Sequence, residues 1–222
     1  LYRQMFYRCS ALTSAPELPA TTLADNCYFS MFFDCTGLAS APELPATSLS
    51  NGCYRQMFRN CSSLTSAPEL PATSLENKCY SQMFSRCSAL TSAPELPATT
   101  LATFCYTGMF SICTGLTSAP ELPATTLADF CYASMFFGCT GLTSAPELPA
   151  KELIRKCYQL MFKDCSKLRY VKALFTTGPS EETTKDWLSG VAASGTFVKS
   201  KNATWNVTGV HGIPNGWKIE TQ

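Results

Sequence analysis

The sequence predicts an α/β repeat solenoid, and three periodic features carry this prediction. Cys-Tyr dipeptides begin every 26 residues, from Cys27 to Cys157. All seven Met residues fall in one column of the repeat, and 12 of the 14 Pro residues fall in two others. Self-similarity at such a period is typical of stacked repeats that bury their apolar faces against each other. We expect a solenoid over residues 1–176, with six full repeats and a partial seventh, and a capping segment over residues 177–222.

The segment LTSAPELP occupies one half of each repeat, and we expect it to form a short strand. In the first copy its apolar residues are Leu12, Ala15 and Leu18. Proline excludes a helix there and lacks the N–H that a strand donates to its neighbour. The strand should therefore end at the second Pro and form little regular ladder.

The other half of each repeat is expected to form a helix. Thr22 is a candidate N-cap, Asp25 follows three residues later, and no Gly or Pro occurs from Leu23 to Asp34. On a helical wheel the residues that stay nearly constant between copies fall on one half, and those that drift fall on the other. The constant face should point inward and the variable face outward. The residues expected to point inward in this copy are Leu23, Cys27, Tyr28, Met31, Phe32 and Cys35.

The 13 cysteines leave three hypotheses. A metal array is disfavoured because the spacings alternate between 8 and 18 residues, and the one histidine, His211, lies outside the repeats. A disulfide scaffold stays open because high Cys content is typical of secreted proteins, although Cys27 and Cys35 would lie about 12 Å apart along a helix. Buried thiols that pack as small hydrophobes are favoured, since Leu1 replaces Cys in the first copy.

The C-terminal segment is expected to be an α+β cap on the open end of the stack. A seventh strand without Pro should span residues 168–174, followed by a helix from Ser180 to about Val191. Trp187 and Leu188 would dock that helix on the stack. Further strands are expected over residues 195–200 and around Trp217.

The repeat resembles a known family. The steps MFFDCTGL and MFRNCSSL resemble the MFxxCxxL signature of BspA-like leucine-rich repeats, and the unit CYxxMFxxCxxLTSAPELPATTL looks like the version found in Bacteroidales surface proteins and some of their phages. The resemblance covers residues 1 to about 174. It implies a right-handed leucine-rich-repeat-like stack of strand-plus-helix units, exposed at the cell surface or secreted and used for adhesion or protein binding. It implies no catalytic residue.

The outward positions carry aromatic and Arg side chains, which often supply the binding energy of interfaces. We take these residues as candidates for ligand binding. The alternative is that some of the Phe side chains fold onto adjacent repeats. The candidates are Arg3, Tyr7, Phe29, Phe33, Arg55, Arg59, Phe104, Phe130 and Phe137.

A second candidate surface is a column of carboxylates in the APELP segments. Stacking would place these like charges about 5 Å apart. Each carboxylate could accept N–H bonds from its own PATT turn, or the row could bind cations or a basic partner. The column consists of Glu17, Glu43, Glu69, Glu95, Glu121 and Glu147.

Composition narrows the function classes. A net charge of +1 gives no steering toward nucleic acid, and no apolar run approaches the ~20 residues of a membrane span. With one His and scattered acids, we expect no enzyme activity, metal or cofactor. We expect an extracellular or cell-surface module that binds a host or microbial surface protein or a glycan. The alternatives are a receptor-binding or tip domain of a phage tail or secretion device, and a structural or self-assembling surface spacer. Because position 1 falls inside the repeat pattern, we expect a piece of a longer protein.

Overall fold

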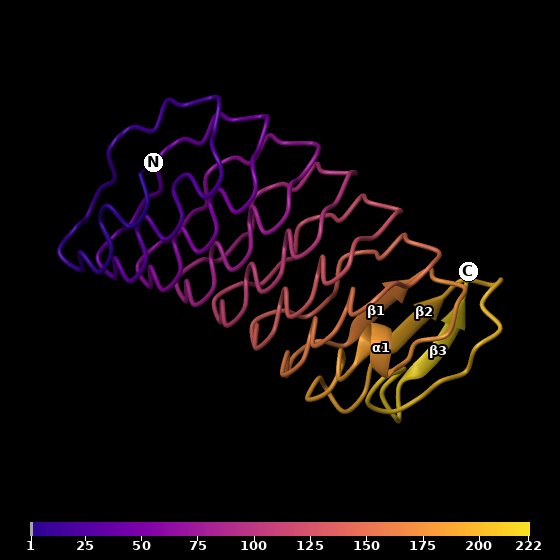
Figure 1. Cartoon of the computed structure of the whole chain (residues 1–222). Helices are drawn as coiled ribbons and strands as arrows, with labels where there is room; N and C mark the ends of the chain where they lie inside the picture. Colours follow the sequence, from indigo (N-terminus) through magenta and orange to yellow (C-terminus); the bar gives the residue numbers. More distant parts are fainter. Residues whose placement is uncertain (1) are drawn as a thin grey trace.

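The computed structural model describes residues 2–222 and shows an elongated stack of similar coils, with the two termini toward opposite ends (Figure 1). Equivalent Tyr and Phe rings of successive repeats lie face to face, with centroids 5.4–6.0 Å apart. The predicted repeat solenoid is therefore confirmed. Leu1, which was expected to pack in place of Cys, lies outside the described residues.

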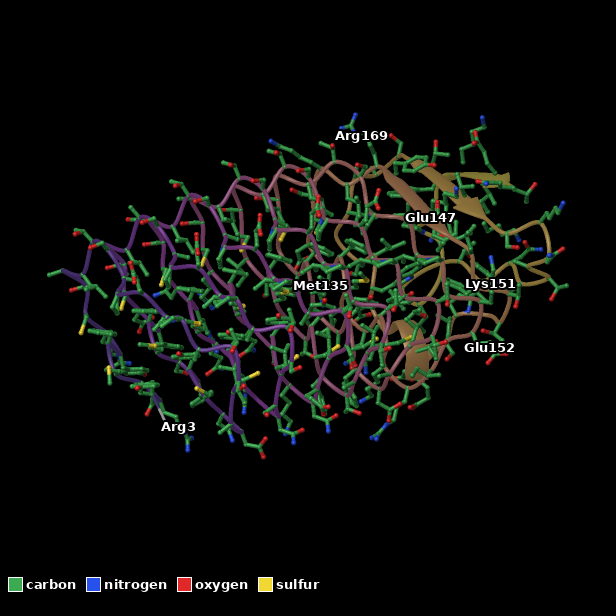
Figure 2. All side chains as sticks on the ribbon, turned by 90° about the horizontal axis from the view of Figure 1, so that it is seen from above. Arg3, Met135, Glu147, Lys151, Glu152 and Arg169 are labelled. Carbon is green, nitrogen blue, oxygen red and sulfur yellow. The ribbon has the colours of Figure 1, made fainter. Side chains whose placement is uncertain are left out.

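The core is formed by the constant columns of the repeat. In the second copy Tyr28, Met31, Phe32 and Cys35 expose at most 2% of their surface. Figure 2 shows Met135, from the same column as Met31, in the interior of the stack, whereas Arg3 and Arg169 lie at its edges. The inward face was thus predicted correctly, although the backbone that creates it differs from the expected one.

The expected helix from Leu23 to Asp34 is wrong, because these residues form a series of turns. The N–H groups of Cys27, Phe29 and Met31 bond to carbonyls three residues back, and most of the alternate N–H groups bond to the next repeat. Such alternation suits the constant residues, which recur every four positions and would drift around a helix of 3.6 residues per turn. Asn26 and Ser30 have positive φ, which a right-handed helix excludes.

The APELP segments behave as their prolines predict. Through the first six repeats the parallel pairing consists of isolated bridges, such as Ser14 to Ser40 and Ser92 to Ser118. Where the prolines disappear, a regular strand forms: β1 spans Tyr170–Ala173. It pairs in parallel with β2 (Thr196–Lys199), which in turn pairs in parallel with β3 (Lys218–Thr221) (Figure 1). The missing proline N–H groups thus limit the sheet in the earlier copies.

The helix expected from Ser180 to Val191 is much shorter. Helix α1 covers Glu181–Thr184, and the chain then returns to turns. The N–H of Phe162 bonds to the carbonyl of Trp187, as the N–H of Phe136 bonds to that of Met161. The stacking pattern therefore continues past the expected boundary at residue 176, with Trp187 in the Met column. This eighth coil was missed because its residues no longer match the repeat.

The cap closes the C-terminal end of the stack with aromatic side chains. Trp187 is fully buried against Tyr158 and Phe175, and Trp205 stacks on Phe175. The indole N–H groups of Trp187, Trp205 and Trp217 each donate to a backbone carbonyl, as buried tryptophans require. The docking role expected for Trp187 agrees with these contacts.

Ile112 is the residue least suited to its backbone conformation. It has a φ of 61°, in a column where other copies place Asn60 and Gly138. A β-branched residue is strongly disfavoured in the left-handed region. We expect Ile112→Asn to raise the free energy of unfolding by about 1 kcal/mol in urea titrations. Ile154→Asn is the control, since Ile154 is also half-buried but does not have a positive φ. Equal destabilisation by both substitutions would contradict the prediction.

Candidate functional site

A row of hollows runs along the side of the solenoid formed by the APELP segments. Five hollows, with volumes of about 250 to 510 Å³, each lie between two consecutive repeats. Their walls are alike: Pro and Glu of one repeat face Pro and Glu of the next. One hollow, for example, is lined by Ala15, Glu17 and Leu18 together with Pro42 and Glu43. We call this surface the APELP face. It presents the same small site at successive repeats.

The carboxylates of the APELP face are exposed in all six copies. Within residues 2–222 none of them accepts a hydrogen bond from a backbone N–H, so the proposed bonds to the PATT turns do not form. Glu147 pairs with Lys172 at 2.8 Å. The five preceding carboxylates form no ion pair among the described residues.

The distribution of charge around the solenoid is uneven, although the chain as a whole carries only +1. No Lys or Arg occurs in residues 10–26, 36–52, 62–77, 88–104 or 114–130, which contain the first five APELP segments. The basic residues of the first six repeats lie instead in or next to the CYxxMFxxC segments, apart from Lys151, which follows the sixth APELP segment. The APELP face is therefore acidic, a property that the net charge conceals.

The candidate residues on the opposite, variable side pack against one another in columns. The guanidinium groups of Arg3 and Arg55 both lie 5.4 Å from the centre of the Phe29 ring, one on each neighbouring repeat. In another column Tyr7 stacks on Phe33 at 4.9 Å, and the guanidinium of Arg59 lies 5.6 Å from the Phe33 ring. These contacts occupy ring faces that a ligand would otherwise use.

A third column holds the remaining aromatic candidates. Phe104 and Phe130 stack with centroids 4.5 Å apart, between Lys78 on one side and Arg155 on the other. Phe137 is half-buried and makes no ring contact of this kind in the described part of the chain. The structure thus distributes the candidates over separate columns, with Arg3 and Tyr7 exposed and the five Phe residues half-buried. Their role in binding stays a prediction.

Polar side chains form a further column that the sequence analysis missed. The Gln56 side chain accepts from Ser30 and donates to Gln82, which also accepts from Arg59. The signal was present in the sequence, since Gln56 and Gln82 are 26 residues apart. Polar groups on this side therefore largely satisfy one another between repeats.

The 13 cysteines are all free thiols in the structure, and the two columns differ. In the second column the thiol donates to the carbonyl of the Phe one repeat earlier, as Cys61 does to Phe32 and Cys87 to Phe58, at 3.1 Å. In the first column only Cys157 has such a contact within residues 2–222, at 3.9 Å. The second column, whose inner thiols donate to carbonyls, is Cys in all seven copies, whereas the first column has Leu1 in one copy.

Burial makes the core thiols weak acids. Loss of solvation raises the pKa of Cys53, Cys105 and Cys113 to about 12, and that of Cys157 to about 11. Because the thiolate is the nucleophile and the metal ligand, these groups are poorly suited to chemistry. Cys9 differs from the others in being exposed.

Other kinds of site were searched for in the described residues. Within residues 2–222 no three His, Cys, Asp or Glu side chains converge as a metal ion would require. Over the same residues, no helix has both the length and the apolar character needed to cross a membrane. His211, the lone histidine, is half-buried in the cap, and its backbone carbonyl accepts a bond from Thr184.

The raised thiol pKa values predict selective alkylation. In the folded protein at pH 8, iodoacetamide should modify Cys9 quickly, because it is exposed, and the buried thiols slowly. Urea should expose all 13 to modification. Mass spectrometry of tryptic peptides would measure the rates. Modification of Cys87 or Cys113 in the native protein as fast as that of Cys9 would contradict the prediction.

The hydrogen bond of the second thiol column predicts a contrast between two alanine variants. Cys87→Ala should lower the free energy of unfolding by about 1 kcal/mol more than Cys79→Ala, because only Cys87 donates to a carbonyl. Serine provides the control: it keeps a donor, so Ser should be tolerated better than Ala at position 87 and no better at position 79. Urea titrations of the four variants would measure the free energies of unfolding. The same difference between Ser and Ala at positions 87 and 79 would contradict the prediction and show that both thiol columns act by packing alone.

Comparison with known proteins gives limited information. No family model and no curated protein matches the sequence. A solved structure that matches is a leucine-rich repeat protein from Bacteroides ovatus ATCC 8483, with 18% sequence identity and a TM-score of 0.38. The alignment covers 97% of this chain and 70% of that one. The function of the chain must therefore be inferred from its own residues.

Proposed function

We propose that the protein is a non-enzymatic binding module whose ligand lies along the APELP face. One observation carries the proposal: hollows with the same lining recur between successive repeats. An elongated ligand that enters several such hollows gains affinity because each further contact is intramolecular. A compact substrate would gain nothing from this repetition.

The chemistry of the face favours a partner with positive groups. Each hollow combines rigid Pro walls with exposed carboxylates, and the first five carboxylates have no basic side chain paired with them within the described residues. A surface protein with a Lys- or Arg-rich extended segment fits this charge better than a neutral glycan does.

We place the module outside the cell, at the surface or secreted, and give it a role in adhesion. The resemblance of the CYxxMFxxCxxL unit to BspA-like repeats supports this location. A receptor-binding tip domain of a phage tail or secretion device would use the same face. A purely structural spacer would need no ligand. Failure of the APELP face to bind any ligand would therefore favour the spacer.

The variable columns form a second candidate surface, favoured by the exposure of Arg3 and Tyr7. A variant with Phe29, Phe33, Arg55 and Arg59 changed to Ser separates the two surfaces. Ligand binding through the APELP face should survive these changes, whereas binding through the variable columns should be lost.

The acidic face predicts binding of a basic peptide that carboxylate removal weakens. The probe is an extended, fluorescently labelled peptide of ten alternating Lys and Ser residues. Its binding to the protein is measured by fluorescence anisotropy. Changing Glu43, Glu69 and Glu95 to Gln should weaken binding about tenfold, and added salt should reduce the difference.

The matched control changes three acids that do not line the hollows, Glu76→Gln, Asp129→Asn and Glu152→Gln. It removes the same charge and should bind like the unchanged protein. Equal weakening by both triple variants would show that net charge, not the APELP face, determines binding.

A further inference from the structure

The chain contains two Asn–Gly steps, Asn51–Gly52 in the repeats and Asn215–Gly216 in the cap. Asparagine is thermolabile, because the main-chain nitrogen of the following residue can attack its side-chain amide. Glycine hinders this attack least, since it has no side chain and its backbone is permissive. The attack then depends on whether that nitrogen is free to approach the amide. The two steps differ in this respect.

The step in the cap lies in an exposed turn. Asn215 and Gly216 are both exposed, and the N–H of Trp217 bonds to the carbonyl of Pro214 at 3.3 Å. Gly216 has a φ of 85°, as the third residue of a type II turn requires. Within residues 2–222 the N–H of Gly216 donates to no acceptor. The nitrogen that would attack is therefore free.

The step in the repeats is held on both sides. The N–H of Gly52 donates to the carbonyl of Asn77 at 2.8 Å, and Gly52 is buried. The N–H of Asn51 bonds to the carboxylate of Asp25 at 3.1 Å, and the carbonyl of Asn51 accepts from Asn26 at 2.7 Å. An attack by the Gly52 nitrogen would break its bond to the next repeat. Asn51 should therefore keep its amide in the folded protein, although the residue is exposed.

From this contrast we propose that Asn215 is a site of spontaneous modification in the folded protein. The Gly216 nitrogen loses its proton and bonds to the side-chain carbon Cγ of Asn215, the bond from Cγ to the amide nitrogen breaks, and ammonia leaves. Water then adds to one of the two carbonyls of the resulting ring. Cleavage of the bond from Cγ to the ring nitrogen leaves aspartate. Cleavage at the main-chain carbonyl leaves isoaspartate, in which the chain runs through Cγ.

Neither step needs an oxidant or a reductant, and neither involves the ligand of the APELP face. The first step requires rotation of the backbone at Asn215. A surface turn closed by one hydrogen bond opens locally at much lower cost than a stacked repeat does. The exposed turn thus permits a reaction that the stack suppresses at Asn51.

The position of the turn gives the modification a consequence for the cap. Ile213, before the turn, is fully buried, and Trp217, after it, exposes only 6% of its surface. The Trp217 indole donates to the carbonyl of Ala192 at 2.9 Å, and β3 begins at the next residue. Isoaspartate lengthens the chain between these two anchors by one methylene group. We expect this to displace Trp217 and loosen the cap, whereas aspartate adds only a charge.

The test keeps the whole chain at mildly alkaline pH under reducing conditions and follows its tryptic peptides by mass spectrometry. Replacement of an amide by a carboxylate raises the mass by one unit, and fragmentation identifies the residue. Asn215 is read in the peptide of residues 202–218, and Asn51 in that of residues 9–55. We expect the rate at Asn215 to exceed that at Asn51 by at least about tenfold, since Gly52 must first give up its hydrogen bond.

Denaturant provides the matched control for the fold. In guanidinium chloride neither step is held, so the two rates should become similar. A second control concerns the cap. Aged protein should unfold at a lower denaturant concentration than fresh protein. Aged Asn215→Gln, whose longer side chain forms the ring far more slowly, and fresh Asn215→Asp, which adds only the charge, should both unfold where the fresh protein does.

Three results would overturn the proposal. The first is an unchanged Asn215, or equal rates at Asn215 and Asn51 in the folded protein. The second is a difference in rate that persists in guanidinium chloride, which would make the flanking residues, not the fold, its cause. The third is equal loss of stability on ageing by the unchanged chain and Asn215→Gln, which would place the damage to the cap at another residue.

Discussion

The structure depends on the backbone hydrogen bonds that join each CYxxMFxxC segment to the next repeat. Alternate N–H groups close turns within the segment, and the others cross to the neighbour. This arrangement fixes the period of four that places Cys27, Met31 and Cys35 on one side of the chain. It also forces successive repeats into register, so equivalent rings must stack. Rings, thiols and thioethers recur in every repeat because each packs against the equivalent side chain of the next repeat.

Much of the fold follows from the sequence because repetition within one chain separates packing residues from the rest. The period, the inward columns and the scarcity of regular strands near the prolines were all predicted. The helix was not, because a period of four over nine residues differs little from 3.6. The sequence does not indicate the positive φ of residues such as Asn26 and Ser30. Other copies carry Lys, Phe or Leu in those columns, and these residues are not typical of the left-handed region. Tertiary pairing overrides local propensity there.

The candidate sites were harder to predict, since they depend on neighbours in the next repeat. Arg3 and Phe29 are attractive as separate binding residues, yet in the stack they contact each other. The carboxylates of Glu43 and Glu69 could have been bound by their own turns, but the structure leaves them free. Both outcomes depend on which side chains stacking brings together, and a single repeat does not reveal this. Reading each column along the stack would have paired Arg3 with Phe29, and Gln56 with Gln82.

The two sides of the coil therefore have different capacities for recognition. On the variable side, polar and aromatic side chains contact those of adjacent repeats through cation–π and amide interactions. A change of residue in one repeat can therefore be accommodated by a change in the next. On the APELP side, proline removes donors that would pair the strands, and hollows remain between them. The residues that weaken the sheet thus also create the repeated sites. A surface that is constant in every copy suits a repetitive ligand, whereas variable columns would suit a unique one.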